Sequence, residues 1–91
     1  MYIVIFTATI NELDQEYENT AVRLRDLAIK EYGCTEFQSF CEGDTELALS
    51  YWPSMEHIQA WQLNEEHLKA QAMGKSKWYK SYQIKIAELI K

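Results

Sequence analysis

A chain of 91 residues has room for one hydrophobic core, so we treat residues 1–91 as a single domain. Its net charge of −5 argues against a nucleic-acid-binding protein, because such proteins gain affinity by neutralising phosphates. Hydrophobic residues make up 47% of the chain and aromatic residues 13%. This content is rich for a small monomer and favours a homodimer in which a second subunit covers apolar surface.

Targeting and redox signals are few. No apolar run approaches the roughly 20 residues of a membrane-spanning helix. The opening residues MYIVIFTATI lack the basic leader and the cleavage site of a signal peptide. Cys34 and Cys41 fall on one predicted strand, about 23 Å apart, whereas a disulfide needs Cα atoms within about 7 Å. We therefore expect two unpaired thiols, no membrane contact and a cytoplasmic location.

The first half of the chain predicts a strand, a helix and a hairpin. Residues 2–10 are rich in β-branched and aromatic side chains on both faces, which is typical of a strand covered on both sides. Apolar residues then recur at three- and four-residue steps from Leu13 to Ala28, which predicts an amphipathic helix ending near Gly33. Residues 34–41 and 46–52 read as strands joined by the turn at residues 42–44, hence as an antiparallel hairpin.

The second half predicts two short helices and a closing strand. Ser54 and Asn64 are candidate N-caps, because their side chains can accept a hydrogen bond from a free amide of the first turn. Gly74 is expected to end the second helix in a left-handed conformation. Tyr82, Ile84 and Ile86 then alternate with more polar positions, as in a strand. The order β-α-β-β-α-β predicts an α+β, ferredoxin-like fold with helices on one face of an antiparallel sheet.

Most signatures of catalytic chemistry are missing from the sequence. It contains no HExxH, CxxC or GxSxG motif, and its histidines, His57 and His67, fall on separate predicted helices. With three glycines in total, it also lacks the glycine-rich loop that binds nucleotide cofactors. The cysteines have no neighbouring base and read as packed thiols. We therefore expect no metal and no cofactor.

The segment from Tyr51 to Tyr82 carries a distinctive pattern of aromatic and polar residues: Tyr51-Trp52, Ser54, Ala60-Trp61, Glu66-His67, Ala70-Gln71, Gly74, Trp78-Tyr79 and Tyr82. With this pattern the segment resembles small single-domain members of the antibiotic biosynthesis monooxygenase superfamily. The resemblance implies a dimeric α+β barrel in which two sheets pack face to face. The superfamily contains several chemistries, so the likeness specifies the fold better than the reaction.

An apolar cavity with a few polar groups is the candidate site, and it suits a small aromatic ligand. Its predicted substrate-binding residues are Phe6, Thr7, Trp52, Trp61 and Tyr79. His67 and Gln71 are the predicted catalytic residues, with His67 chosen because histidine exchanges protons near neutral pH. A purely structural interpretation stays open, because a tryptophan at helical spacing such as Trp61 is more often a core residue than a substrate platform.

The resemblance implies two chemistries. In cofactor-independent monooxygenases a phenolic substrate is deprotonated and reacts directly with O₂; here Trp61 would orient the substrate, and His67 or Gln71 would handle the proton or the developing oxyanion. In haem-degrading relatives an iron-ligating histidine follows the pocket tryptophan by ten residues, but that count from Trp61 reaches Gln71. We therefore favour the cofactor-independent oxygenase, with a non-catalytic ligand-binding or stress-related domain of the same fold as the alternative.

Overall fold

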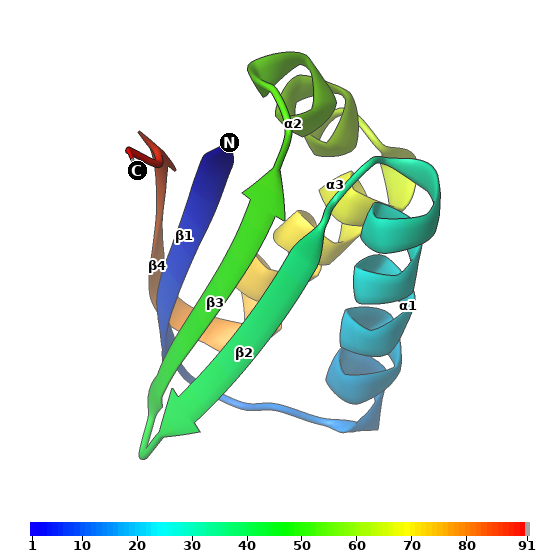
Figure 1. The fold of residues 1–91 in the computed structure, drawn as a ribbon. Helices are drawn as coiled ribbons and strands as arrows, with labels where there is room; N and C mark the ends of the chain where they lie inside the picture. The colour runs from blue at the N-terminus through cyan, green and yellow to red at the C-terminus, as the bar shows by residue number, and fades with distance from the viewer. Residues whose placement is uncertain (91) are drawn as a thin grey trace.

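The computed structural model describes residues 1–90, whose four strands form one antiparallel sheet in the order β2-β3-β1-β4. The elements in chain order are β1 (Tyr2–Ile10), α1 (Gln15–Glu31), β2 (Glu36–Glu42), β3 (Thr45–Trp52), α2 (Met55–Gln62), α3 (Glu65–Met73), the π-helical turn η1 (Gly74–Trp78) and β4 (Tyr79–Glu88). Helices α1 and α3 lie over the same face of the sheet, which we call the helical face (Figure 1). The ferredoxin-like α+β prediction is confirmed.

Helix α1 begins and ends where its sequence allows. Asp14 is the N-cap, and its Oδ1 accepts a hydrogen bond of 2.9 Å from the amide of Tyr17. The helix is followed by Gly33, whose φ of 84° is accessible to glycine at little cost. A Cβ on this residue would also lie 2.6 Å from the ring of His57. The predicted stop near Gly33 therefore serves both the backbone turn and the packing of α2.

Two sequence-based boundaries need correction. Strand β2 begins at Glu36 rather than Cys34, because the amide of Cys34 bonds the Ala28 carbonyl at the end of α1. Gly74 is not left-handed, since its φ of −59° and ψ of −47° are helical. The chain continues from α3 into η1, and the last strand therefore starts at Tyr79, earlier than the alternation alone suggested.

The apolar core lies at the end of the sheet that α2 covers. It contains Ala28, Cys34, Trp52, Ile58 and Trp61. Trp52 is fully buried, and its indole Nε1 donates a hydrogen bond of 2.9 Å to Ser50 Oγ. A buried indole N–H needs such a partner, so Ser50 makes the inward position of Trp52 compatible with an apolar core.

A β-bulge lies where β1 meets β4. Thr9 pairs with Ser81, but Ile10 pairs with Tyr79, so Lys80 is left over as the extra residue. In a regular strand, residues three apart point to opposite faces. The bulge instead lets both Tyr79 and Tyr82 reach the helical face, where they contact the Phe6 ring of β1.

Candidate functional site

A small cavity lies on the helical face between α3, η1 and the sheet; we call it the α3 cavity. Its volume is about 60 Å³, and its lining residues are Phe6, His67, Gln71, Gly74, Tyr79, Tyr82 and Ile84. One of the lining residues, Ile84 of the edge strand β4, is 38% exposed, which places part of the cavity wall at the surface. The structure therefore brings four of the predicted site residues together around one space: Phe6, His67, Gln71 and Tyr79.

His67 supplies an unused polar atom to this wall. Its amide bonds the Asn64 side chain that caps α3, at 3.0 Å, which fixes the first turn. Its ring stacks on Trp61 with centroids 4.6 Å apart and an interplanar angle of 18°. Among residues 1–90, Nδ1 of His67 is buried and has no hydrogen-bond partner. Burial lowers the pKa of His67 below its usual value, so the imidazole is neutral near pH 7.

The remaining predicted substrate-binding residues lie outside the cavity wall. Trp52 and Trp61 belong to the core, with ring centroids 6.2 Å apart, and Trp61 contributes by supporting the ring of His67 from behind. Thr7 pairs with Leu47 and Gln83, so it lies on the sheet face opposite Phe6. Any role of these three in substrate binding stays a prediction.

Gly74 is required by the shape of the cavity. A Cβ on this residue would lie 3.0 Å from Cδ2 and 3.1 Å from Cε2 of Tyr79. The Tyr79 ring also packs against Phe6 and Tyr82, with centroids 5.4 and 6.4 Å away. The absence of a side chain at residue 74 therefore lets the phenol lie flat along the cavity wall.

A buried carboxylate lies behind that wall. Glu46 of β3 is only 3% exposed, and its two oxygens each accept a hydrogen bond from a tyrosine hydroxyl. Tyr17 of α1 donates to Oε1, and Tyr79 donates to Oε2 at 2.7 Å. Burial raises the pKa of Glu46, and burial together with this carboxyl raises the pKa of Tyr79 far above the neutral range. Glu46 is not among the predicted site residues, although it lies an even number of residues from Trp52 on β3 and so points to the same face.

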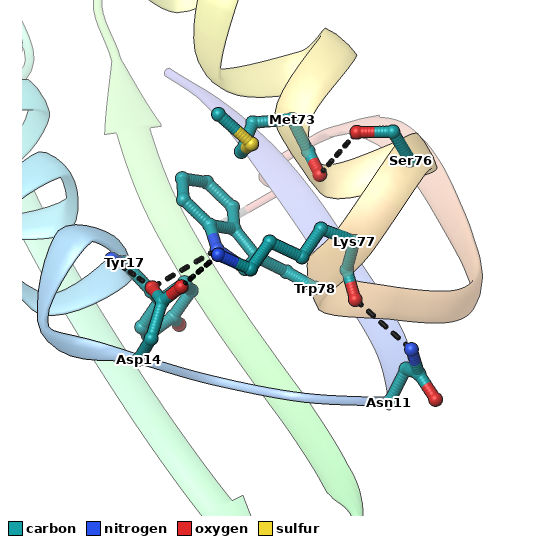
Figure 2. Close-up of polar contacts among 7 residues, drawn as sticks. All are labelled: Asn11, Asp14, Tyr17, Met73, Ser76, Lys77 and Trp78. Atoms are coloured by element: carbon teal, nitrogen blue, oxygen red, sulfur yellow. Dashed lines mark hydrogen bonds and ion pairs between the residues drawn. The ribbon is translucent and has the colours of Figure 1, made fainter.

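Polar contacts fasten the β1–α1 loop to η1 (Figure 2), and η1 is followed directly by Tyr79 at the start of β4. Asp14 accepts a hydrogen bond of 3.2 Å from Trp78 Nε1 and forms an ion pair of 2.5 Å with Lys77 Nζ. Asn11 Nδ2 donates to the Lys77 carbonyl at 3.0 Å. These contacts lower the pKa of Asp14, chiefly through the hydrogen bond from Lys77.

A second hollow lies between α1 and α3 and has a volume of about 290 Å³. Its walls carry mixed charges, including Arg23 and Glu66, which pair at 2.7 Å and are both exposed. None of the predicted site residues lines it. In the part of the chain that the structure describes, no cluster of three or more His, Cys, Asp or Glu side chains is arranged to hold a metal. The α3 cavity is therefore the better candidate.

Comparison with known proteins gives a sequence relative and several structural neighbours. No protein-family model matches the chain. The uncharacterized protein YqjZ of Bacillus subtilis is 37% identical over 89 residues, which cover 97% of this chain and 78% of the relative. SnoaB, a cofactor-independent oxygenase from Streptomyces nogalater, superimposes with a TM-score of 0.81 at 10% identity, over 99% of this chain and 93% of its own. A structure described as an antibiotic biosynthesis monooxygenase gives 0.70 at 14% identity, with both chains fully covered.

Proposed function

Because the chain belongs to the same family as YqjZ and has the fold of the antibiotic biosynthesis monooxygenases, we propose that it is a cofactor-independent monooxygenase of a small aromatic or quinol-like compound. The observation that carries the proposal is the buried, unpartnered Nδ1 of His67 in the wall of an otherwise aromatic cavity. An unsatisfied buried polar atom is costly and therefore calls for an explanation, and a ligand that completes the hydrogen bond supplies one.

The residues of the α3 cavity would have different roles in such a reaction. The rings of Phe6, Tyr79 and Tyr82 provide flat apolar walls for an aromatic ring. His67 is neutral, and its Nδ1 hydrogen-bonds the substrate oxygen, which orients that oxygen and stabilises it as the phenolate forms. Gln71 has an amide group that can donate to the developing oxyanion. O₂ then reacts with the electron-rich ring, while the surrounding side chains limit access of water.

The size of the cavity limits the substrate. An engineered protein cavity that binds benzene measures roughly 150 Å³, which is more than twice the 60 Å³ found here. A ring therefore fits if it projects through the mouth beside Ile84, or if Tyr82 swings outward. This geometry favours a compound of one or two rings over a large polycyclic one.

The test is O₂ consumption by metal-stripped protein with a panel of quinols, naphthols and anthrones. We expect uptake above the buffer rate, and a loss of roughly 10²–10³-fold in kcat/KM in His67→Gln, the range typical of removing one hydrogen-bonding group from a developing oxyanion. His57→Gln is the matched control, because His57 lies on α2 against Gly33 and is not part of the cavity wall. Equal loss in both variants would contradict the assignment of His67.

A non-catalytic ligand-binding domain is the second candidate, and the small volume of the cavity favours it. In that case a phenol raises the melting temperature by mass action without O₂ uptake, and His67→Gln abolishes the shift. Absence of turnover on the whole panel together with such a shift would support binding over catalysis.

We also propose that the chain forms a homodimer through the face of the sheet opposite the helices. Ile3, Ile5, Leu47 and Leu49 point to this face by their register, and Phe40 on it is 54% exposed. Phe40→Glu should yield a monomer in light scattering at micromolar concentration. Leu63→Glu is the control, since Leu63 is 75% exposed at the α2–α3 junction. A monomeric parent protein would remove the proposal.

A cytoplasmic location belongs to the same proposal. Cys34 and Cys41 are both free, which suits a reducing compartment. None of the helices in residues 1–90 is long and apolar enough to cross a membrane.

A further inference from the structure

Glu46 is an unusual group to find in the interior of this domain. It is almost fully buried, yet the two ion pairs within residues 1–90 are Arg23–Glu66 and Lys77–Asp14, and neither neutralises it. A buried carboxylate without a cation destabilises the fold unless strong hydrogen bonds satisfy it. Two tyrosine hydroxyls do so here, and one of these tyrosines lines the α3 cavity.

We propose that Glu46 is the proton acceptor of the α3 cavity and that the Tyr79 hydroxyl relays the proton to it. This inference rests on the proposed function, because it assigns the final position of the proton that the substrate releases. Since the Tyr79 hydrogen points at Oε2 of Glu46, its oxygen presents lone pairs to other donors. A phenolic O–H in the cavity is the donor that these lone pairs would receive.

The transfer balances without an added reactant. The substrate O–H bond breaks as a new O–H bond forms on Tyr79, and the original Tyr79 O–H bond breaks as one forms on Glu46 Oε2. The site carries one negative charge before and after, because the charge moves from the carboxylate to the substrate oxygen. The renewed Tyr79 O–H then donates to the phenolate, which stabilises it in a site with little water.

The surroundings of the two titratable groups at the cavity agree with this direction. Burial raises the pKa of Glu46 and lowers that of His67, so the carboxylate accepts a proton more readily than its type suggests and the imidazole less readily. The groups that face Glu46 are Tyr17 from α1, Tyr79 from β4 and the register partner Cys41 from β2. None of these is a base that competes for the proton in neutral solution.

The experiment measures where a proton goes when a phenolate binds, and it needs neither O₂ nor turnover. Pentafluorophenol is a compact single-ring probe that is ionised at neutral pH, and its ¹⁹F shifts distinguish phenolate from phenol. Calorimetry in buffers of different ionisation enthalpy gives the proton uptake on binding. For the parent protein we expect uptake of about one proton per ligand, with the ligand still in its phenolate form.

Variants locate the acceptor. Glu46→Gln keeps the shape of the side chain and should bind the phenolate without proton uptake. Tyr17→Phe removes the other hydrogen bond to Glu46 but leaves the cavity wall intact, so uptake should persist. Tyr79→Phe should weaken binding roughly tenfold or more, the cost of losing a hydrogen bond to a charged oxygen. Circular dichroism confirms that each variant is folded.

Several outcomes would overturn the relay. They are undiminished proton uptake by Glu46→Gln with the ligand still ionised, a neutral phenol bound to the parent protein, and no binding at all. The two proposals fail separately. Absence of O₂ uptake on every substrate with proton uptake intact would remove the oxygenase but keep the relay, whereas Glu46→Gln with full oxygenase activity would remove the relay alone.

Discussion

The two ends of the helical face are built from different chemistry. At the α2 end, Trp52, Trp61 and Ile58 form a dry aromatic and aliphatic core in which Ser50 is the polar partner of Trp52. At the opposite end, Tyr17 and Tyr79 surround a buried carboxylate, and Trp78 bonds an aspartate. The first end stabilises the fold through hydrophobic burial. The second end buries polar groups, which lowers the free energy of unfolding, a pattern that is common at functional sites. The α3 cavity lies between them.

Trp52→Ala should disrupt the core at the apolar end and cause the largest loss of stability among the variants considered. Removing a fully buried indole deletes its contacts and leaves a large void, so we expect a loss of about 3–5 kcal/mol in the free energy of unfolding. Urea unfolding followed by circular dichroism measures it. A loss below about 1 kcal/mol would mean that the core repacks around the void and that Trp52 is not central to it.

The pH dependence of stability should separate the buried carboxylate from the imidazole. The pKa of Glu46 is raised on folding, so its contribution is present below its ordinary value of 4.5 and is lost as pH rises through the folded pKa. The pKa of His67 is lowered, so its contribution is present above its ordinary value of 6.5 and is lost as pH falls through the folded pKa. For one group the slope cannot exceed about 1.4 kcal/mol per pH unit.

Glu46→Gln should therefore remove the decline of stability above pH 4.5, and His67→Gln should remove the decline below pH 6.5. Urea midpoints measured across this range test both. Parallel curves for the parent protein and Glu46→Gln would show that Glu46 titrates as it does in the unfolded chain.

Loss of an N-cap should cost more at the polar end than at the apolar end. Asp14 and Ser54 each cap a helix, and losing a cap costs about 0.5–2 kcal/mol. Asp14 also holds Trp78 and Lys77, so Asp14→Ala should lower the free energy of unfolding more than Ser54→Ala does. Equal losses in denaturant unfolding would show that the contacts to η1 are energetically neutral.

Gly74→Ala should change stability least of these variants while weakening ligand binding. Residue 74 is helical, so alanine gains up to about 1 kcal/mol in propensity, which offsets the 3.0 Å contact with the Tyr79 ring. The added methyl group reduces a cavity of about 60 Å³. We expect an unfolding midpoint near that of the parent protein but weaker binding of a phenol in calorimetry. Unchanged affinity would place the ligand elsewhere.

The difference between the two ends also explains which parts of the structure could be predicted from the sequence alone. The sequence predicted the four strands and the helices α1, α2 and α3 but not the π-helical turn η1, and the caps Ser54 and Asn64 are confirmed. The three-residue spacing of Met55, Ile58 and Trp61 correctly predicted the apolar face of α2, on which Ile58 and Trp61 are buried.

The prediction for Gly74 was wrong because a glycine can serve more than one purpose. It was interpreted as a helix stop, but its lack of a side chain instead lets the Tyr79 ring pack closely against it. No spacing rule predicts such a contact.

The polar end was less predictable, because its geometry depends on a bulge. Tyr79 and Tyr82 would face opposite sides of a regular strand. No local sequence pattern predicts that Lys80 is the extra residue of a β-bulge. The buried position of Glu46 could have been predicted. It lies an even number of residues from Ser50 and Trp52 along β3, so its side chain points inward if theirs do. A charged side chain on the inward face of a strand is therefore the signal that could have identified the buried carboxylate.

The two cysteines differ in exposure, and this difference allows a probe to be attached near the buried carboxylate of Glu46. Burial raises the pKa of Cys34 and keeps it from reacting, whereas Cys41 is exposed and pairs in register with Glu46. A maleimide dye should therefore label one thiol per folded chain and two after denaturation. A fluorophore attached in this way lies across the strand from the buried acid, where its emission would report a change of charge as it happens.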